Sequence, residues 1–120
     1  MRHIDLNTVP LEHILLFDSI NSSSACFAEG SGDFRIHVLE IKPGGHIGLH
    51  PAGFAQILIV TAGSGYACGQ DGVRYTLRCG EAAFIERGEM HAKGSESGMK
   101  ALMIQVSDCS MTPNNPDGSK

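Results

Sequence analysis

The sequence has no long apolar run, no cluster of basic residues and no closely spaced pair of cysteines. No apolar segment approaches the ~20 residues that a membrane-spanning helix needs. No apolar stretch follows a basic start, as it does in a secretory signal. The four cysteines, Cys26, Cys68, Cys79 and Cys109, form no Cys-x-x-Cys pair, so we expect reduced thiols that serve as packing residues. These absences predict a soluble protein of the cytoplasm with no membrane partner.

The charge of the chain is low and evenly spread. The formal net charge is -4, and the nine lysines and arginines are scattered along the sequence. A nucleic acid or an anionic membrane surface would require a basic patch. The charge pattern therefore excludes these partners and favours a small organic ligand or substrate.

Length and composition predict one folded domain that spans residues 1-120. A chain of 120 residues is long enough for a single hydrophobic core. Its hydrophobic content of 42% and charged content of 18% are those of a globular protein.

Helical signals are scarce, and strand signals dominate. Only Leu11 to Phe17 has an apolar run that could form a short helix. Two strands flank the glycine-rich segment Glu29 to Asp33, which predicts a hairpin there. A second hairpin, with a type I′ turn, is expected at Asp71 and Gly72.

In the segment from Phe54 to Gly63, apolar residues occupy both odd and even positions. This pattern is typical of a strand covered on both faces. Short strands separated by glycine-marked turns, with almost no helix, predict an all-β fold. We expect an antiparallel sandwich or barrel.

The spacing of the histidines suggests a metal-binding site. His46, His50 and Ala52 nominally share one side of an extended strand, and Gln56 has the same parity beyond a corner. A closed barrel would bring His91, at the end of another strand, opposite His50. Two imidazoles and an amide oxygen in an apolar barrel would form an open metal site.

At these positions the chain resembles the small single-domain cupins, a superfamily with two sequence motifs. The first motif, G-x5-H-x-H-x3-E-x6-G, falls on Gly44, His50, Ala52, Gln56 and Gly63. The second, G-x5-P-x-G-x2-H-x3-N, falls on Gly80, Glu86, Gly88, His91 and Ser95. The resemblance implies an antiparallel double-stranded β-helix, or jelly-roll barrel, over about residues 34-106. An N-terminal extension would cover residues 1-33, and a flexible tail would cover 110-120. Together with the two-sided strand, the resemblance also implies a homodimer.

The family's metal ligands are the two histidines and the glutamate of the first motif and the histidine of the second. The resemblance therefore implies a divalent metal held by His50, Gln56 and His91, with Ala52 in place of one histidine. His46 is a weaker candidate to replace that missing ligand. Iron, manganese, nickel and zinc all accept such ligands. Without a protein anion the ion would be a strong Lewis acid with reduced affinity.

The function expected from this resemblance is an enzyme that acts on a small organic metabolite. Isomerase, cyclase, lyase and dioxygenase chemistry are all compatible with it. The alternative is a metal-free barrel that binds or senses a small ligand, in which His50 and His91 are hydrogen-bonded remnants of a former site.

Further candidate residues follow from their positions. Glu86 is either an acid/base at the barrel mouth or, as we favour, a solvated charge. Five apolar residues are candidate pocket walls, although such residues are most often simple core. They are Phe34, Ile36, Phe84, Met90 and Met103.

Overall fold

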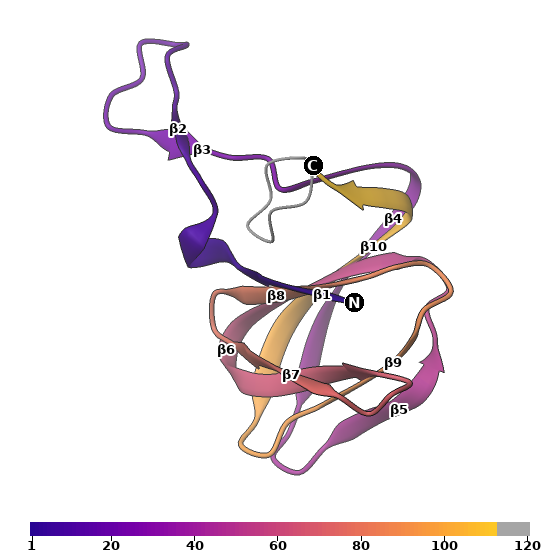
Figure 1. Cartoon of the computed structure of the whole chain (residues 1–120). Coiled ribbons are helices and arrows are strands. Elements are labelled where there is room, and N and C mark those ends of the chain that lie inside the picture. Colours follow the sequence, from indigo (N-terminus) through magenta and orange to yellow (C-terminus); the bar gives the residue numbers. More distant parts are fainter. Residues whose placement is uncertain (113–120) are drawn as a thin grey trace.

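The computed structural model describes residues 1-112 and consists almost entirely of strands (Figure 1). One 3-10 turn, η1 (Leu6–Thr8), is the only helical element in that range. The strands are β1 (Arg2–Asp5), β2 (Glu12–His13), β3 (Ser23–Ser24), β4 (Ala28–Ile41), β5 (His46–Pro51), β6 (Ala55–Gly69), β7 (Arg74–Arg78), β8 (Glu81–Ile85), β9 (Met90–Gly94) and β10 (Met99–Met111). No helix in the described range is long and apolar enough to cross a membrane.

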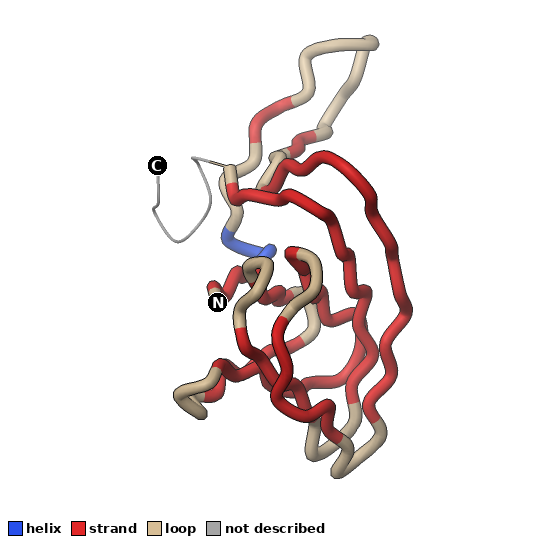
Figure 2. Tube along the Cα trace, turned by 90° about the vertical axis from the view of Figure 1, so that its right-hand side faces the viewer, coloured by secondary structure: helices blue, strands red, loops and turns tan. Residues whose placement is uncertain are grey.

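The long strand β6 joins the two walls of an antiparallel barrel. Its first half pairs with β8 and β10, within a sheet of order β1-β8-β6-β10-β4. Its second half pairs with β7 and β9, and β9 also pairs with β5. Figure 2 shows how these strands curl around one interior. The predicted all-β antiparallel barrel is therefore confirmed.

Apolar side chains pack on both faces of β6. Leu58 and Val60 face the barrel interior, and Ile57 faces the opposite side. The interior cluster also contains Ile41, Ala67, Leu77, Ala83, Met99 and Ala101. The outer cluster contains Ile4, Ala82 and Phe84, with Leu6, Val9, Phe27 and Met111 packed against it. The two-sided strand is thus confirmed, and segments of the same chain supply its outer cover.

The predicted hairpin at Glu29 to Asp33 is wrong. β4 runs through this segment and pairs with β10, and the register shifts where Gly32 and Asp33 of β4 lie opposite Ser107 of β10. The glycines form no turn here, and they allow the two strands to approach each other closely. A β-carbon at Gly30 would lie 2.6 Å from the carbonyl oxygen of Asp108.

Two other local predictions have different outcomes. The hairpin at Asp71 and Gly72 is confirmed between β6 and β7. Only Gly72 has a positive φ there, and its N–H donates to the Gly69 carbonyl, so the turn is not type I′. Leu11 to Phe17 forms no helix and contains the short strand β2. Of the predicted tail, residues 113-120 lie outside the described part of the chain.

The close approach at Gly30 can be tested with Gly30→Ala. The added methyl group must displace backbone, so we expect a loss of about 1–3 kcal/mol in the free energy of unfolding. Gly53→Ala is the matched control, because a β-carbon there meets nothing within 4 Å. Urea denaturation of both variants measures the difference. Equal stability of the two variants would contradict the continuous β4–β10 pairing.

Candidate functional site

Two histidines face each other across the β5–β9 pair. His50 and His91 are direct register partners, and their ring centroids lie 4.4 Å apart. The Nδ1 of His50 lies 2.7 Å from the Gly48 carbonyl, and that of His91 lies 3.3 Å from the Glu89 carbonyl. These carbonyls assign the proton of each neutral ring to Nδ1 and leave Nε2 as an acceptor. The expected meeting of His50 and His91 is confirmed.

A buried lysine, Lys93, completes this cluster. It follows His91 by two residues on β9, so both side chains lie on the same face of the strand. Only 2% of Lys93 is exposed to solvent. Its ammonium donates to Oε1 of Gln56 and to Nε2 of His91, each at 3.2 Å. The third contact is to Sδ of Met103 at 3.7 Å. All three N–H groups of the ammonium are therefore directed at acceptors.

The three groups that the Lys93 ammonium contacts are neutral, and none is a carboxylate. Burial lowers the pKa of Lys93 from 10.5 to about 8. Burial, followed by the charge of Lys93, lowers the pKa of His91 from 6.5 to about 4. At neutral pH the barrel therefore holds one positive charge, on Lys93, beside the neutral imidazole ring of His91.

Lys93 escaped the motif analysis because the cupin motifs assign no role to that position. The alternation of side chains along a strand is the sequence feature that could have identified Lys93. In the sequence Met90-His91-Ala92-Lys93-Gly94, a strand that turns His91 inward also turns Lys93 inward. A lysine at an inward position of a barrel strand is unusual, since lysines are rarely fully buried.

A row of polar side chains continues from the cluster across the inner wall of the barrel. Arg35 on β4, Gln105 on β10 and Gln56 on β6 are register neighbours. His37, one inward position further along β4, has its Nε2 3.1 Å from Oε1 of Gln105. The row runs from buried Gln56 through half-buried Gln105 to exposed Arg35. The row thus extends from the buried cluster to the surface, where an open depression that we call the mouth lies beside Arg35.

The mouth is a shallow, open depression of about 450 Å³ beside this row. It is lined by Gly32, Asp33, Phe34, Arg35 and Phe54. The guanidinium carbon of Arg35 lies 4.5 Å above the ring centre of Phe54. This volume is within the range of small-molecule sites, about 300–1,000 Å³.

Three other predicted positions lie apart from the Lys93 contacts. His46 is exposed on β5, where it pairs with Gly94. Glu86 is exposed in the turn between β8 and β9, where its N–H donates to the Glu89 carboxylate. Ala52 is only 3% exposed, so a small buried side chain occupies the position of the missing histidine.

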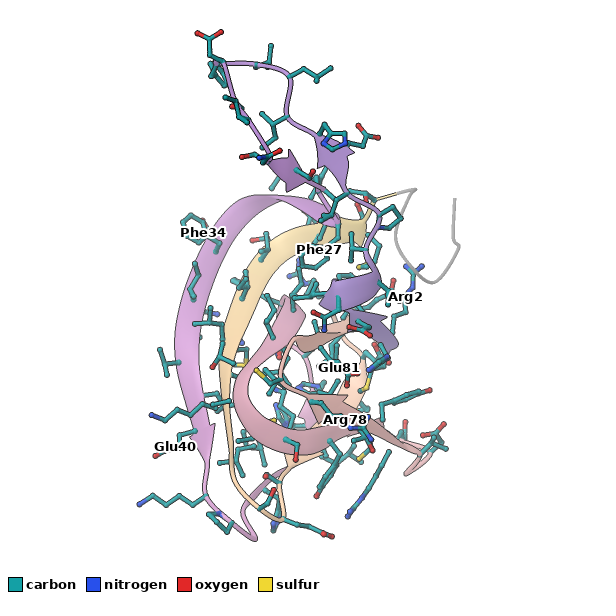
Figure 3. The ribbon with its side chains drawn as sticks, turned by 90° about the vertical axis from the view of Figure 1, so that its left-hand side faces the viewer. Arg2, Phe27, Phe34, Glu40, Arg78 and Glu81 are labelled. Atoms are coloured by element: carbon teal, nitrogen blue, oxygen red, sulfur yellow. The ribbon has the colours of Figure 1, made fainter. Side chains whose placement is uncertain are left out.

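The five predicted pocket walls divide among different environments. Phe34 and Ile36 are 67% and 59% exposed on the outer side of β4, and Figure 3 shows Phe34 pointing away from the barrel. Phe84 belongs to the outer cluster. Met90 lines a surface depression with Tyr75 and Glu89. Only Met103 contacts the Lys93 cluster, because its inward position on β10 lies opposite Leu58 of β6.

The donors expected for a metal fit such an ion poorly in this arrangement. Gln56 and His91 are two of the three, and both already accept from the Lys93 ammonium. A divalent ion bound at ~2.0–2.2 Å from them would lie against that positive charge, with no carboxylate in the cluster to offset it. Within residues 1-112, no group of three or more His, Cys, Asp or Glu side chains is placed to hold a metal.

No protein-family model matches the sequence, and no curated protein is similar to it in sequence. Solved structures do share its fold. A cupin-like protein from Thermotoga maritima aligns over 86% of this chain and 92% of its own, with a TM-score of 0.60 and 17% identity. A cupin-2 domain protein from Shewanella frigidimarina aligns over 65% of this chain and 74% of its own, with a TM-score of 0.55 and 19% identity.

A third solved structure with a similar fold is that of an enzyme. The DMSP lyase DddQ from Ruegeria pomeroyi aligns over 70% of this chain and 45% of its own, with a TM-score of 0.59 and 19% identity. These likenesses show that the chain has the cupin fold, an antiparallel double-stranded β-helix. At such identities they show the fold alone.

The unpaired charge of Lys93 predicts a distinctive pH dependence of stability. Because its pKa is lower in the folded chain than in the unfolded one, the unfolded chain binds more protons between pH 8 and 10.5. The free energy of unfolding should therefore rise over this interval, by up to roughly 3 kcal/mol. Urea denaturation at several pH values measures it. Lys93→Met should lose this rise, whereas Lys100→Met, at an exposed position of β10, should keep it. Parallel pH profiles for the wild type and Lys93→Met would contradict the burial of the charge.

Proposed function

We propose that this cupin-fold protein binds a small organic anion in its barrel without a metal, and that Lys93 supplies the positive charge. The observation that supports this is the bonding of the Lys93 ammonium to Gln56 and His91, two of the three expected metal donors. The ammonium takes the electrostatic role that a metal ion would have. A carboxylate or enolate oxygen is the ligand group that such a charge favours.

One contact of Lys93 is weak enough for a ligand oxygen to replace it. Its contact to Sδ of Met103 is the longest, at 3.7 Å, and a thioether is a weak acceptor. An anionic oxygen would replace this contact with a stronger, charge-assisted hydrogen bond. The ligand would reach Lys93 from the mouth, past Gln105 and Arg35, and Arg35 offers a second positive charge.

His50 gives the site a proton acceptor. Its Nδ1 proton is directed at the Gly48 carbonyl, so its Nε2 carries the basic lone pair. Its ring lies 4.4 Å from that of His91, at a tilt of 53°, and Lys93 contacts His91. We propose that Nε2 of His50 takes the proton from the carbon next to the ligand's carbonyl group, and that the released electron pair forms an enolate held by Lys93.

The enolate then reacts in one of two ways. Return of the proton from His50 to a different carbon gives isomerisation, and expulsion of a leaving group from the neighbouring carbon gives a lyase reaction. Both reactions belong to the classes expected from the sequence. If His50 transfers no proton, the same site is a carrier or sensor of organic anions, which is the metal-free alternative.

Metal content separates this proposal from a metal-dependent one. Elemental analysis of the protein purified without added metal should find iron, manganese, nickel and zinc well below one equivalent per chain. The measurement should be repeated after incubation with each ion and desalting. One equivalent of metal that is lost in His50→Ala/His91→Ala, with the fold intact by circular dichroism, would overturn the metal-free proposal.

Anion binding tests the role of Lys93 directly. A panel of carboxylates and oxo acids of two to six carbons is screened by calorimetry at pH 7. We expect at least one to bind, and Lys93→Met to weaken its binding at least tenfold. Binding should also weaken as the pH rises above about 8, because the ammonium of Lys93 is then lost.

Lys100→Met is the matched control, since it removes the same charge from an exposed position. Lys93→Arg keeps the charge and should restore part of the affinity if the variant folds. An affinity that is unchanged in folded Lys93→Met would exclude Lys93 from the site.

A further inference from the structure

A second positive side chain, Arg35 on β4, faces the inner side of the barrel wall. Figure 3 shows its neighbour Phe34 pointing away from the barrel, and successive side chains of a strand point to opposite faces. The guanidinium carbon of Arg35 lies 4.5 Å from the centre of the Phe54 ring. Because the face of an aromatic ring attracts a cation, this contact holds Arg35 in place beside the mouth.

The Arg35 guanidinium has no protein anion as a partner in the described part of the chain. Within residues 1-112 no carboxylate forms an ion pair with it, and its one recorded contact is the Phe54 ring. Asp33 lines the same depression, but its exposed carboxylate is not paired with Arg35 in this range. The planar guanidinium carries five N–H donors in a fixed arrangement that matches a carboxylate. Arg35 can therefore bind an anion that enters the mouth.

Gln105 lies between the two positive groups and adds a neutral donor. It is the register partner of Arg35 on one side and, on the other, of Gln56, which accepts from Lys93. Oε1 of Gln105 lies 3.1 Å from Nε2 of His37, so the ring donates to it and the amide NH₂ group of Gln105 is turned away from that ring. An ammonium, an amide and a guanidinium thus follow one another along the inner wall.

Strand geometry sets the separation of the two charges. Neighbouring strands lie about 4.8 Å apart, so two strand steps place Arg35 about 10 Å from Gln56. The ammonium of Lys93 lies 3.2 Å from Oε1 of Gln56, and the guanidinium lies over Phe54, two residues before Gln56. The two charges are therefore on the order of 10 Å apart. Charge-assisted hydrogen bonds of about 2.8 Å at both ends would leave about 4 Å between the two bound oxygens of a ligand.

We propose that the anion bound in this barrel is a short dicarboxylate, with one carboxylate on Lys93 and the other on Arg35. The gap of about 4 Å between the bound oxygens is spanned by dicarboxylates of about four to six carbons. Two positive charges balance the two negative charges of such a ligand, and Gln105 can donate to an oxygen between its ends. Arg35 then determines the specificity for a second acidic group. This inference rests on the function proposed above, since Lys93 must bind the first carboxylate.

Calorimetry with matched ligands tests the second contact. Succinate and glutarate are compared at pH 7 with their half-amides, succinamate and glutaramate, which have the same length and only one carboxylate. The wild type should bind each dicarboxylate at least about fivefold more tightly than its half-amide. Arg35→Gln should abolish this difference without weakening the half-amides. Arg74→Gln is the matched control and should keep it, because Arg74 also lies over an aromatic ring, that of Tyr66 at 3.9 Å, but on β7. Circular dichroism should show an unchanged fold, since both arginines are exposed.

Lys93→Met separates this inference from the proposed function. It should weaken dicarboxylates and half-amides alike, because both place a carboxylate on Lys93. If none of the four ligands binds, or if folded Lys93→Met binds them like the wild type, the proposed function fails and the inference fails with it. If Lys93→Met weakens binding but dicarboxylates and half-amides bind equally well to the wild type, only the dicarboxylate inference is overturned. The same holds if Arg35→Gln keeps the preference for dicarboxylates.

Discussion

The burial of the Lys93 ammonium among neutral partners is the interaction on which the interior of this barrel depends. Removing a charge from water is costly, and here hydrogen bonds to Gln56 and His91 offset the cost without a carboxylate. Those bonds orient the amide and the imidazole, and burial together with the Lys93 charge lowers the pKa of His91 and keeps its ring neutral. The same charge makes the interior attractive to anions and unfavourable for a second cation. One side chain therefore sets the electrostatic character of the site.

The fold places this lysine through simple strand geometry. β9 pairs with β5 on one side and with β6 on the other, so His91 lies opposite His50 while Lys93 points at the inward side chains of β6 and β10. β6 has a second, outer apolar face that the N-terminal segment covers. The barrel wall is thereby fixed on both sides around the cluster. A rigid wall keeps a buried ammonium aligned with its three acceptors.

The structures that share this fold include that of a DMSP lyase, but a shared fold does not transfer a reaction. What distinguishes this barrel is its set of donors, in which an alanine, an amide and a lysine accompany the two histidines. Proton transfer beside a carbonyl group needs a base and a positive charge, and these are the roles that the proposed function gives to His50 and Lys93.

Much of this protein was predictable from the sequence alone. The glycine-marked strands, the two-sided segment Phe54 to Gly63 and the spacing of His50 and His91 determine an antiparallel cupin barrel and bring the histidines together, because strand parity and turn chemistry are local properties. The local pattern failed where contacts are made between distant segments. Gly30 and Gly32 suggested a turn, yet they allow β4 to approach β10. Ile36 was expected to line a pocket, although its side chain lies on the outer side of β4. Only the tertiary structure decided that Lys93 meets Gln56, His91 and Met103, since an ammonium's partners in a barrel come from strands far apart in the chain.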